Sequence, residues 1–262
     1  MEQMFYKKRK LNEKALIIYL CAGYPDLEFS RDLILTAVKA GADVVEVGIP
    51  FSDPLADGPV IQHASQQALS KGMNNTKALE LAAEIKKCVD IPIIIMSYYN
   101  PLYRYGLENF CRDAHEAKLN GIIVPDLPLE ESAMMVSLTR KFGLGFVPLV
   151  SPTSPGERLK KISSTALGFI YCVSITGTTG SALQSFRDAE YMAEELRRIT
   201  SKPLSLGFGI ESPEQVLRVS PLYDGVIVGS ALIRIIERFK DNRELCLEKV
   251  GAFITSLKKA CI

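Results

Sequence analysis

Three carboxylates fall close together in residues 44–59, which read VVEVGIPFSDPLADGP. Glu46 interrupts the apolar run 44–47, and the glycines and prolines that follow exclude regular structure around Asp53 and Asp57. An unpaired carboxylate in an apolar setting costs free energy or takes up a proton. An acid at the end of a buried strand therefore indicates a function that offsets this cost. General acid–base chemistry is such a function, because it requires carboxyl groups with shifted pKa values.

Each of these acids also has a purely structural interpretation. Glu46 could pair with a lysine or a backbone N–H, and Asp57 could cap a helix that begins at Pro59. Asp53 precedes Pro54, a pair that favours a turn, so we assign it a structural role. For Glu46 and Asp57 the sequence of this stretch alone leaves both interpretations open.

Three glycine-containing turns in the last third of the chain indicate a phosphate site. The motifs ITGTTG (175–180), GFG (207–209) and VGSAL (228–232) each follow an expected strand. Glycines let backbone N–H groups approach an anion closely, and the expected helix start at Ser230 adds the positive end of a helix dipole. Any one motif alone is typical of a tight turn, but three together favour phosphate.

Short apolar runs alternate with longer amphipathic stretches, which predicts alternating strands and helices. The runs are β-branched or apolar throughout, as expected for parallel strands buried on both faces. The expected strands are 16–20, 43–47, 91–96, 121–124, 145–149, 169–173, 203–206 and 225–228. The expected helices are 27–40, 75–89, 107–119, 130–142, 155–163, 185–200, 212–219, 231–239 and 244–259.

This alternation predicts an α/β fold, the (β/α)8 TIM barrel, in a chain of 262 residues. Extra helices are expected at the N-terminus (1–10), after the second strand (60–71) and at the C-terminus. No linker-like segment divides the chain, so we expect one domain over residues 1–262. A doubly wound open sheet is the rival fold, but no GxGxxG motif follows the first strand. Chemistry in a barrel lies at the carboxyl ends of the strands, where the acids and glycine turns fall.

Composition argues against several classes of function. Lys and Arg total 31 against 30 Asp and Glu, so the net charge of +1 gives no sign of nucleic-acid binding. Neither a signal peptide nor a membrane span is expected, because the basic start lacks a following apolar stretch. Six scattered cysteines without a CxxC pair are typical of reduced thiols in a cytoplasmic protein.

Absent residue types narrow the chemistry further. No lysine stands at the carboxyl end of an expected strand, so a Schiff-base aldolase is disfavoured. Two histidines and the spacing of the acids suit neither a zinc nor a magnesium site, so no metal is expected. Metal-free acid–base chemistry on a phosphorylated substrate remains, in a pocket with aromatic walls formed by Tyr19, Tyr98 and Phe208. Tyr171 lies at an alternating apolar position, so core packing is the simpler interpretation for it.

Several of these motifs resemble those of the tryptophan synthase alpha subunit. They are EVGIPFSDPLADGPVIQ (46–62), MSYYNPLYRYG (96–106), GIIVPDLPLEE (121–131), SITGTTG (174–180), GFGI (207–210) with SPEQV (212–216), and GVIVGSALI (225–233). The resemblance runs from about Leu16 to Arg238. It implies a lyase of tryptophan biosynthesis that cleaves indole-3-glycerol phosphate to indole and glyceraldehyde 3-phosphate by retro-aldol chemistry.

The resemblance also implies a role for each matching residue. Glu46 would move protons between indole C3 and the glycerol hydroxyl, Asp57 would accept the indole N–H, and Tyr171 would lie near the glutamate. The other matching residues are Gly180, Gly209, Gly229 and Ser230 for phosphate, Tyr19, Tyr98, Ile123 and Phe208 for the indole pocket, and Asp53, Pro54, Asn100 and Pro128 for a partner interface. The implied partner is a beta subunit that carries pyridoxal phosphate, in an α2β2 heterotetramer, and no cofactor is expected in this chain.

One position departs from the family pattern. Thr178 stands where valine is common in the lid loop after the sixth strand, and lid closure excludes water from such a site. A second hypothesis is therefore a catalytically weak alpha subunit that mainly activates its beta partner. A barrel isomerase or epimerase acting on a similar sugar phosphate is a third. The presence of both Glu46 and Asp57 favours the lyase.

Overall fold

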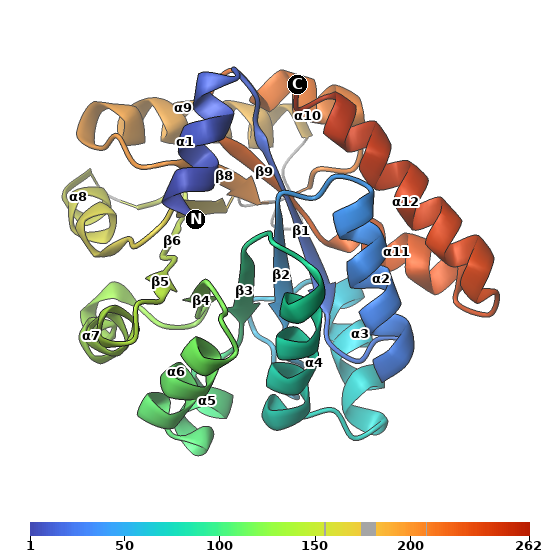
Figure 1. The fold of residues 1–262 in the computed structure, drawn as a ribbon. Coiled ribbons are helices and arrows are strands. Elements are labelled where there is room, and N and C mark those ends of the chain that lie inside the picture. The colour runs from blue at the N-terminus through green and yellow to red at the C-terminus, as the bar shows by residue number, and fades with distance from the viewer. Residues whose placement is uncertain (155, 174–181, 208) are drawn as a thin grey trace.

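The computed structural model describes residues 1–154, 156–173, 182–207 and 209–262, with residues 182–185 described as backbone only. The helices surround a curved sheet (Figure 1). Its strands are β1 (Ala15–Cys21), β2 (Val44–Gly48), β3 (Ile93–Met96), β4 (Gly121–Ile123), β5 (Gly145–Phe146), β6 (Leu149–Val150), β7 (Ile170–Val173), β8 (Leu204–Gly207) and β9 (Gly225–Val228). The helices are α1 (Glu2–Lys10), α2 (Leu27–Lys39), α3 (Pro59–Ser70), α4 (Asn75–Cys88), α5 (Tyr99–Tyr105), α6 (Leu107–Glu116), η1 (Leu129–Glu131), α7 (Ala133–Lys141), α8 (Gly156–Thr165), α9 (Ala182–Ile199), α10 (Pro213–Val219), α11 (Ser230–Phe239) and α12 (Arg243–Lys259).

Neighbouring strands are all parallel, in the order β5-β4-β3-β2-β1-β9-β8-β7-β6. Only Val147 and Pro148 separate β5 from β6, so one extended segment pairs with β4 on one side and with β7 on the other. The Val147 N–H donates to the Ile122 carbonyl at 3.1 Å, and the Tyr171 N–H donates to the Pro148 carbonyl at 3.0 Å. The sheet therefore closes on itself, and the expected barrel fold is confirmed.

The strand residues sort by alternation into two apolar clusters. Val45 and Val47 belong to the cluster that packs against the helices, whereas Val44 and Ile94 belong to an inner cluster enclosed by the sheet. Side chains two residues apart on a strand share a face, so Glu46 points inward with Val44. Both faces of the sheet are covered, which explains why its strands are apolar without interruption.

Side-chain caps fix the starts of several helices. The caps accept from the N–H three residues on, and the pairs are Asp26 with Phe29, Asn74 with Lys77, Ser212 with Gln215 and Asn242 with Leu245. Gly41, with φ +109°, turns the chain after α2 in a conformation that a residue with a Cβ rarely adopts. These local signals explain why the expected helix 27–40 agrees with the observed α2.

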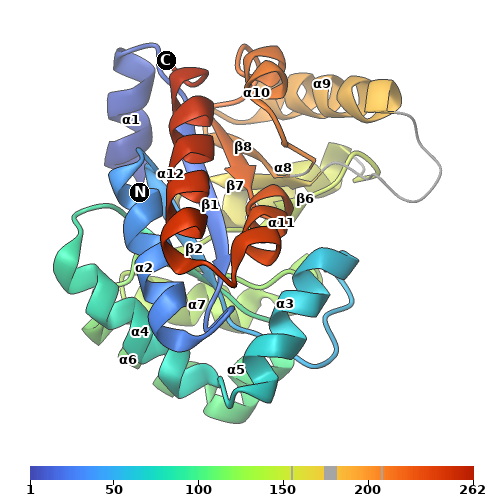
Figure 2. The same ribbon diagram turned by 90° about the vertical axis from the view of Figure 1, so that its right-hand side faces the viewer.

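Helix α1 closes the end of the barrel at which the strands begin (Figure 1, Figure 2). Phe5 is buried inside this end, with its ring centroid 5.5 Å from that of Phe169. A Cβ added to Gly121 or to Gly168 would meet the Met1 Cε, at 2.9 Å and 2.8 Å. Glycines at this end of the sheet therefore leave the space that the Met1 side chain fills.

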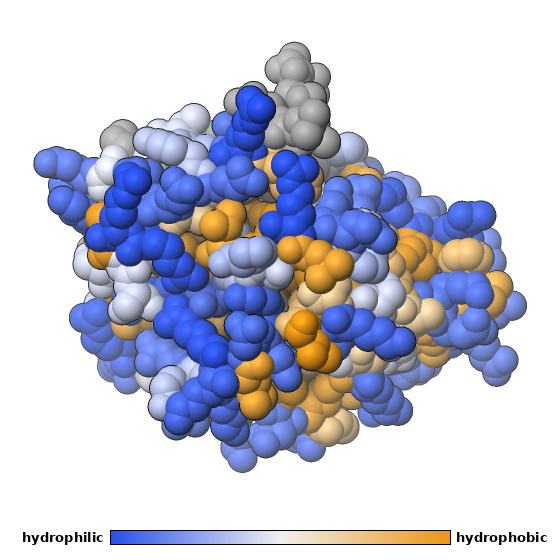
Figure 3. All heavy atoms as spheres, turned by 90° about the horizontal axis from the view of Figure 1, so that it is seen from above, coloured by the Kyte–Doolittle hydropathy of each residue, from blue (hydrophilic) through white to orange (hydrophobic). Residues whose placement is uncertain are grey.

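Figure 3 shows the molecule of Figure 1 from above. Hydrophilic residues cover most of this face, and apolar residues form smaller separated areas. Exposed large apolar residues include Tyr6 on α1 and Leu11 just after it. Scattered residues of this kind are normal on a protein surface. Among the described residues, no helix is both long enough and apolar enough to cross a membrane.

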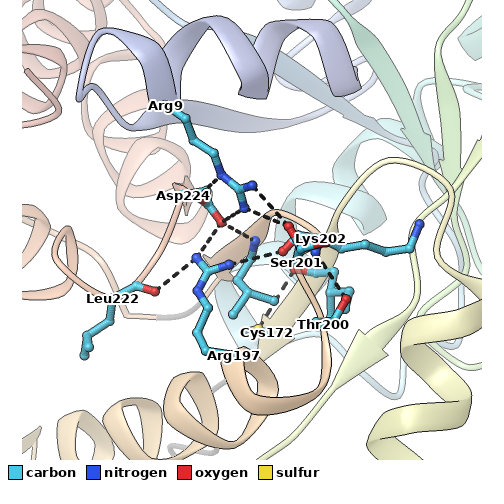
Figure 4. Close-up of polar contacts among 10 residues, drawn as sticks. Arg9, Cys172, Arg197, Thr200, Ser201, Lys202, Leu222 and Asp224 are labelled. Carbon is cyan, nitrogen blue, oxygen red and sulfur yellow. Dashed lines mark hydrogen bonds and ion pairs between the residues drawn. The ribbon is translucent and has the colours of Figure 1, made fainter.

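One buried carboxylate ties α1 and α9 to the start of β9 (Figure 4). Asp224 accepts from Arg9 Nε at 2.7 Å and from Arg197 Nη2 at 2.6 Å. It also accepts from the Leu204 N–H of β8 at 2.8 Å. Burial alone would raise the pKa of the Asp224 carboxyl, but the bonds from the two guanidinium groups outweigh it and hold that pKa below its usual value.

The structure differs from expectation in three segments. Residues 99–101 fall between the expected strand 91–96 and the expected helix 107–119, but they begin α5. The first N–H of that helix, at Tyr99, donates to Asp126 Oδ1 at 2.9 Å. The acceptor is 27 positions away, so no local pattern could indicate it. The expected strand 145–149 is split into β5 and β6, because Pro148 has no N–H for a sheet ladder. The expected helix 130–142 is likewise divided into η1 and α7.

Replacing the buried anchor should destabilise the fold. We expect Asp224→Asn to lower the free energy of unfolding by about 2 kcal/mol, because Arg9 and Arg197 lose their shared anion. Urea denaturation at pH 7 measures this. The matched control is Glu108→Gln, which breaks the exposed ion pair with Lys141 and should change stability little. Equal midpoints for the two variants would contradict an anchoring role for Asp224.

Candidate active site

Glu46 lies on the inner face of β2, near the carboxyl end of the strand. It is paired in register with Tyr19 of β1 and Ile94 of β3. The residue is 0 % exposed, and neither carboxylate oxygen has a hydrogen-bond partner among the described residues. Burial therefore raises the pKa of Glu46 to about 8, because it disfavours the charged form. At neutral pH Glu46 carries a proton that it can give away.

Asp57 lies in the loop between β2 and α3, beside Tyr98. The Tyr98 hydroxyl accepts the Ala56 N–H at 3.0 Å, which holds this loop against the end of β3. Burial raises the pKa of Asp57 to about 6, an effect that a hydrogen bond with Tyr98 partly offsets. Asp57 is therefore mostly charged at pH 7. The two acids differ in protonation at the same pH, which is a common basis for separate acid and base roles.

Two tyrosine rings enter the same space from other strands. The Tyr19 ring lies over Gly48 of β2, and the Tyr171 ring lies over Gly207 of β8. A Cβ at either glycine would overlap the facing ring. Burial and then the negative charges of the two acids raise the pKa of the Tyr171 hydroxyl well above its ordinary value. Tyr171 therefore borders the acids, where core packing was the simpler expectation from its sequence position.

The sequence pattern did not single out Gly48 and Gly207 as parts of a site. Each ends a strand and lies two residues after an inward-facing side chain, Glu46 in one case and Ser205 in the other. A glycine at the last inward position of a strand is the signal that could have identified them. The absent side chains make room for tyrosine rings from the neighbouring strands.

The glycine turns after β8 and β9 lie side by side, because these two strands pair directly. Gly229 and Ser230 form the start of α11, and no side chain caps this helix. An uncapped helix start presents free N–H groups, which suit an anion. Gly209 has φ +65°, and no described atom lies within 4 Å of a Cβ added to it. The remaining candidates, Gly180 and Phe208, lie outside the described residues.

The expected walls of the indole pocket fall on different strands around the acids. Ile123 of β4 is fully buried in the inner cluster, together with Val147. The Tyr98 ring follows β3, with its centroid 5.3 Å from that of Phe51. Tyr19 is 7 % exposed. The structure therefore brings the three described wall residues to the end of the barrel that carries Glu46.

The residues expected to face a partner follow the neighbouring strands β2, β3 and β4. Asp53, Asn100 and Pro128 are exposed, and Pro54 is half-buried. Leu55 between the acids is 93 % exposed, a position that the sequence pattern did not single out. These residues share one rim of the barrel, at the carboxyl ends of the strands.

A cavity of about 520 Å³ opens beside this rim. It lies between the β4–α7 and β6–α8 connections, and its lining includes Pro128, Ser151, Arg158 and Val173 but neither of the two acids. In the described part of the chain, no three His, Cys, Asp or Glu side chains come close enough to hold a metal ion. The candidate site is therefore defined by the two acids and the side chains around them.

Comparison with known proteins assigns the chain to a family. The sequence model of the family described as tryptophan synthase alpha chain matches residues 5–262. The chain belongs to the tryptophan synthase alpha chain family. The resemblance carried by the motifs is thereby confirmed over nearly the full length of the protein.

The alignments with similar proteins cover almost the whole of this chain and almost the whole of each relative. The tryptophan synthase alpha chain of Carboxydothermus hydrogenoformans is 45 % identical over 98 % of this chain and 97 % of its own. The crystal structure of tryptophan synthase subunit alpha from Legionella pneumophila has a TM-score of 0.91 at 35 % identity, covering 99 % of this chain and 97 % of that one. A structure of Mycobacterium tuberculosis tryptophan synthase has a TM-score of 0.91 at 32 % identity, covering 99 % and 96 %.

Membership of the tryptophan synthase alpha chain family confirms the expected lyase, which cleaves indole-3-glycerol phosphate in tryptophan biosynthesis. It favours neither the activator hypothesis nor the isomerase hypothesis. The roles of single residues rest on the geometry described above.

A charge placed at Gly209 tests the position of the phosphate. Gly209→Asp should weaken binding of glyceraldehyde 3-phosphate about tenfold, because a carboxylate repels the anion. Isothermal titration calorimetry measures the affinity. The matched control is Gly209→Asn, since both side chains tolerate the left-handed backbone and differ mainly in charge. Equal loss in both variants would indicate crowding, and unchanged affinity in both would place the phosphate elsewhere.

Proposed function

We propose that this chain cleaves indole-3-glycerol phosphate with Glu46 as the proton carrier and Asp57 as the acceptor of the indole N–H. The observation that carries the proposal is the complete burial of the Glu46 carboxyl, without a described partner, on a strand followed by the loop that carries Asp57. Burial raises the pKa of Glu46 to about 8 and that of Asp57 to about 6. The cleavage needs both a proton donor and a negative charge at its start, and between these pKa values the pair supplies both.

In the first step the Glu46 carboxyl gives its proton to indole C3. The carbon gains a hydrogen, and the ring becomes a cation whose positive charge is shared with its nitrogen. The charged Asp57 carboxylate accepts the hydrogen bond of that N–H and stabilises the cation. Tyr171 of β7 interacts with Glu46 and would limit where the carboxyl can move.

In the second step the Glu46 carboxylate takes the proton of the glycerol hydroxyl. The carbon that bore this hydroxyl becomes the carbonyl carbon of glyceraldehyde 3-phosphate. The electron pair of the broken C–C bond returns to the ring, and neutral indole is released. Glu46 is again protonated, so one carboxyl group serves first as acid and then as base.

The phosphate binds at the glycine turns on the other side of the barrel from the acids. Gly229 and Ser230 would hold it through backbone N–H groups at the uncapped start of α11, and Gly209 through its own N–H in the turn after β8. Gly180 would be a fourth contact. Tyr19, Tyr98, Ile123 and Phe208 would form the walls around the indole ring. In this proposal the reacting carbons would lie between the phosphate and Glu46.

A pyridoxal-phosphate beta subunit is the proposed partner, in an α2β2 complex that receives the indole. The proposed contact is the rim that carries Asp53, Pro54, Asn100 and Pro128, where exposed polar and proline residues follow three neighbouring strands. The cofactor would belong to the partner, and we propose that this chain holds none of its own.

Residues 1–262 are proposed to form one domain that works in the cytoplasm. Strands from both halves of the chain contribute to the same closed sheet, which supports a single domain. All six cysteines are free, and five of them are buried, which suits a reducing compartment.

A catalytically weak alpha chain that mainly activates its partner is the alternative, suggested by Thr178 in the expected lid. Indole release from indole-3-glycerol phosphate, measured with and without the beta subunit, distinguishes the lyase from this alternative. No release in either state, with partner activation preserved, would favour the activator.

Removing the proton carrier tests the mechanism. Glu46→Gln should lower kcat about a thousandfold and leave the affinity for glyceraldehyde 3-phosphate nearly unchanged, because the amide cannot transfer the proton. The matched control is Glu108→Gln, an exposed substitution of the same kind on α6, which should leave kcat unchanged. Loss of ligand affinity together with kcat would instead indicate that Glu46 maintains the structure of the site.

The pH dependence tests the assignment of the two acids. We expect kcat/KM to rise with pH through about 6, as Asp57 loses its proton, and to fall through about 8, as Glu46 loses its own. Asp57→Asn should retain the falling limb and lose the rising one. Activity that increases through pH 8 would show that Glu46 does not begin the reaction as an acid.

A further inference from the structure

The Tyr19 hydroxyl differs from those of the other buried tyrosines. The described chain buries Tyr19, Tyr24, Tyr98 and Tyr223. Three of these hydroxyls have partners: Tyr24 donates to Glu237, Tyr98 accepts from the Ala56 N–H, and Tyr223 donates to the Ala189 carbonyl. No described residue bonds to the hydroxyl of Tyr19, which is 7 % exposed. A ring that served only as an apolar wall would not need a hydroxyl, and this one is left without a protein partner inside the site.

The position of this hydroxyl is fixed by two glycines. The near side of the Tyr19 ring packs beside Gly229, with Cδ1 3.1 Å from a Cβ added there. The far side of the ring, including the hydroxyl, lies over Gly48 of β2. The ring therefore spans from β9 across to β2, and a larger residue at Gly48 would displace the hydroxyl.

Gly48 and Glu46 face inward on the same strand, with Glu46 one step deeper. Residues two apart on a strand are separated by about 6.6 Å, which the length of a glutamate side chain largely bridges. The Tyr19 hydroxyl, over Gly48, thus lies one inward position beyond Glu46, towards the carboxyl end of β2. A donor and an acceptor, each without a described partner, face one another across this short span.

We infer that Tyr19 is a positioning residue whose hydroxyl donates a hydrogen bond to the Glu46 carboxylate once that acid has given its proton to the substrate. The inference rests on the proposed role of Glu46 as proton carrier. A neutral Glu46 carboxyl gains less from such a donor than the carboxylate left after the transfer, which is an unpaired charge in a dry site. A hydroxyl held beyond it stabilises the charge at the stage when it forms and aims the carboxylate at the glycerol hydroxyl.

Burial is the cause of the raised pKa of Glu46. The titratable groups around Tyr19 are Glu46 on β2, Asp57 in the β2–α3 loop and Tyr98 after β3, and Tyr171 of β7 interacts with both acids. Cys21 of β1 points the other way, with its Sγ 3.9 Å from Ser65 Oγ. These groups are the same in wild type and in a Tyr19 variant. A donor to the charged form lowers the pKa of a carboxyl, so removal of the Tyr19 hydroxyl should raise the pKa of Glu46.

The test is Tyr19→Phe in complex with the beta subunit, measured as glyceraldehyde 3-phosphate formation across pH 5–10. The falling limb should move up by about one pH unit, and kcat near pH 7 should fall about tenfold. The rising limb belongs to Asp57 and should stay in place. KM for indole-3-glycerol phosphate should change little, because the ring that borders the indole is retained.

Tyr223→Phe is the matched control, since it removes a buried hydroxyl bonded to a carbonyl outside the site, and both limbs should match wild type. Tyr19→Leu removes the ring as well as the hydroxyl. KM for indole-3-glycerol phosphate should therefore rise in Tyr19→Leu but not in Tyr19→Phe, which keeps the ring that borders the indole. If the falling limb of Tyr19→Phe matches that of wild type, the inference about Tyr19 is wrong. The proposed mechanism is still supported in that case if Glu46→Gln has lost cleavage. Retained cleavage in Glu46→Gln would instead overturn the mechanism itself.

Discussion

A carboxyl group without a described hydrogen-bond partner lies inside the closed sheet at Glu46. Much of the surrounding structure keeps water and counter-charges from it: strands on either side, the α1 side chains at one end of the barrel and tyrosine rings at the other. The raised pKa follows from this enclosure. Relative to an ordinary carboxyl, such a group destabilises the fold increasingly as the pH rises from 4.5 to about 8. The buried carboxyl therefore lowers the stability of the fold at neutral pH, and the same burial keeps a proton on Glu46 at that pH.

Glycines determine where large side chains can reach in this interior. Gly48 admits the Tyr19 ring, Gly207 admits the Tyr171 ring, and Gly121 admits the end of Met1. In each case the large residue comes from another element, so neither sequence position explains the contact by itself. Close packing in a protein interior requires that such pairs match in volume. The shape of the site is therefore set as much by absent side chains as by present ones.

Local patterns in the chain predict most of the fold. Uninterrupted apolar runs identify the strands, and residues such as Asp26 and Ser212 mark helix starts, because these signals act over a few positions. The start of α5 was missed because its acceptor, Asp126, belongs to a different loop. The acids could be found by type and position, but whether Tyr171 packs the core or borders Glu46 depends on strand register, which composition does not encode.

The split fifth strand divides the barrel into two unequal arms joined at β1 and β9. Strand β5 pairs with β4 over two residues and β6 pairs with β7 over two residues, and Pro148 in the same segment has no N–H to donate. The pairings of this segment with β4 and with β7 are shorter than the five-residue pairing of β1 with β2, so they hold the cylinder closed with the fewest ladder pairs. One arm carries both acids, and the other carries Tyr171 and the glycine turns. A molecule held at the turns by its phosphate and at the acids by its ring would span the two arms and act as a brace across the cylinder.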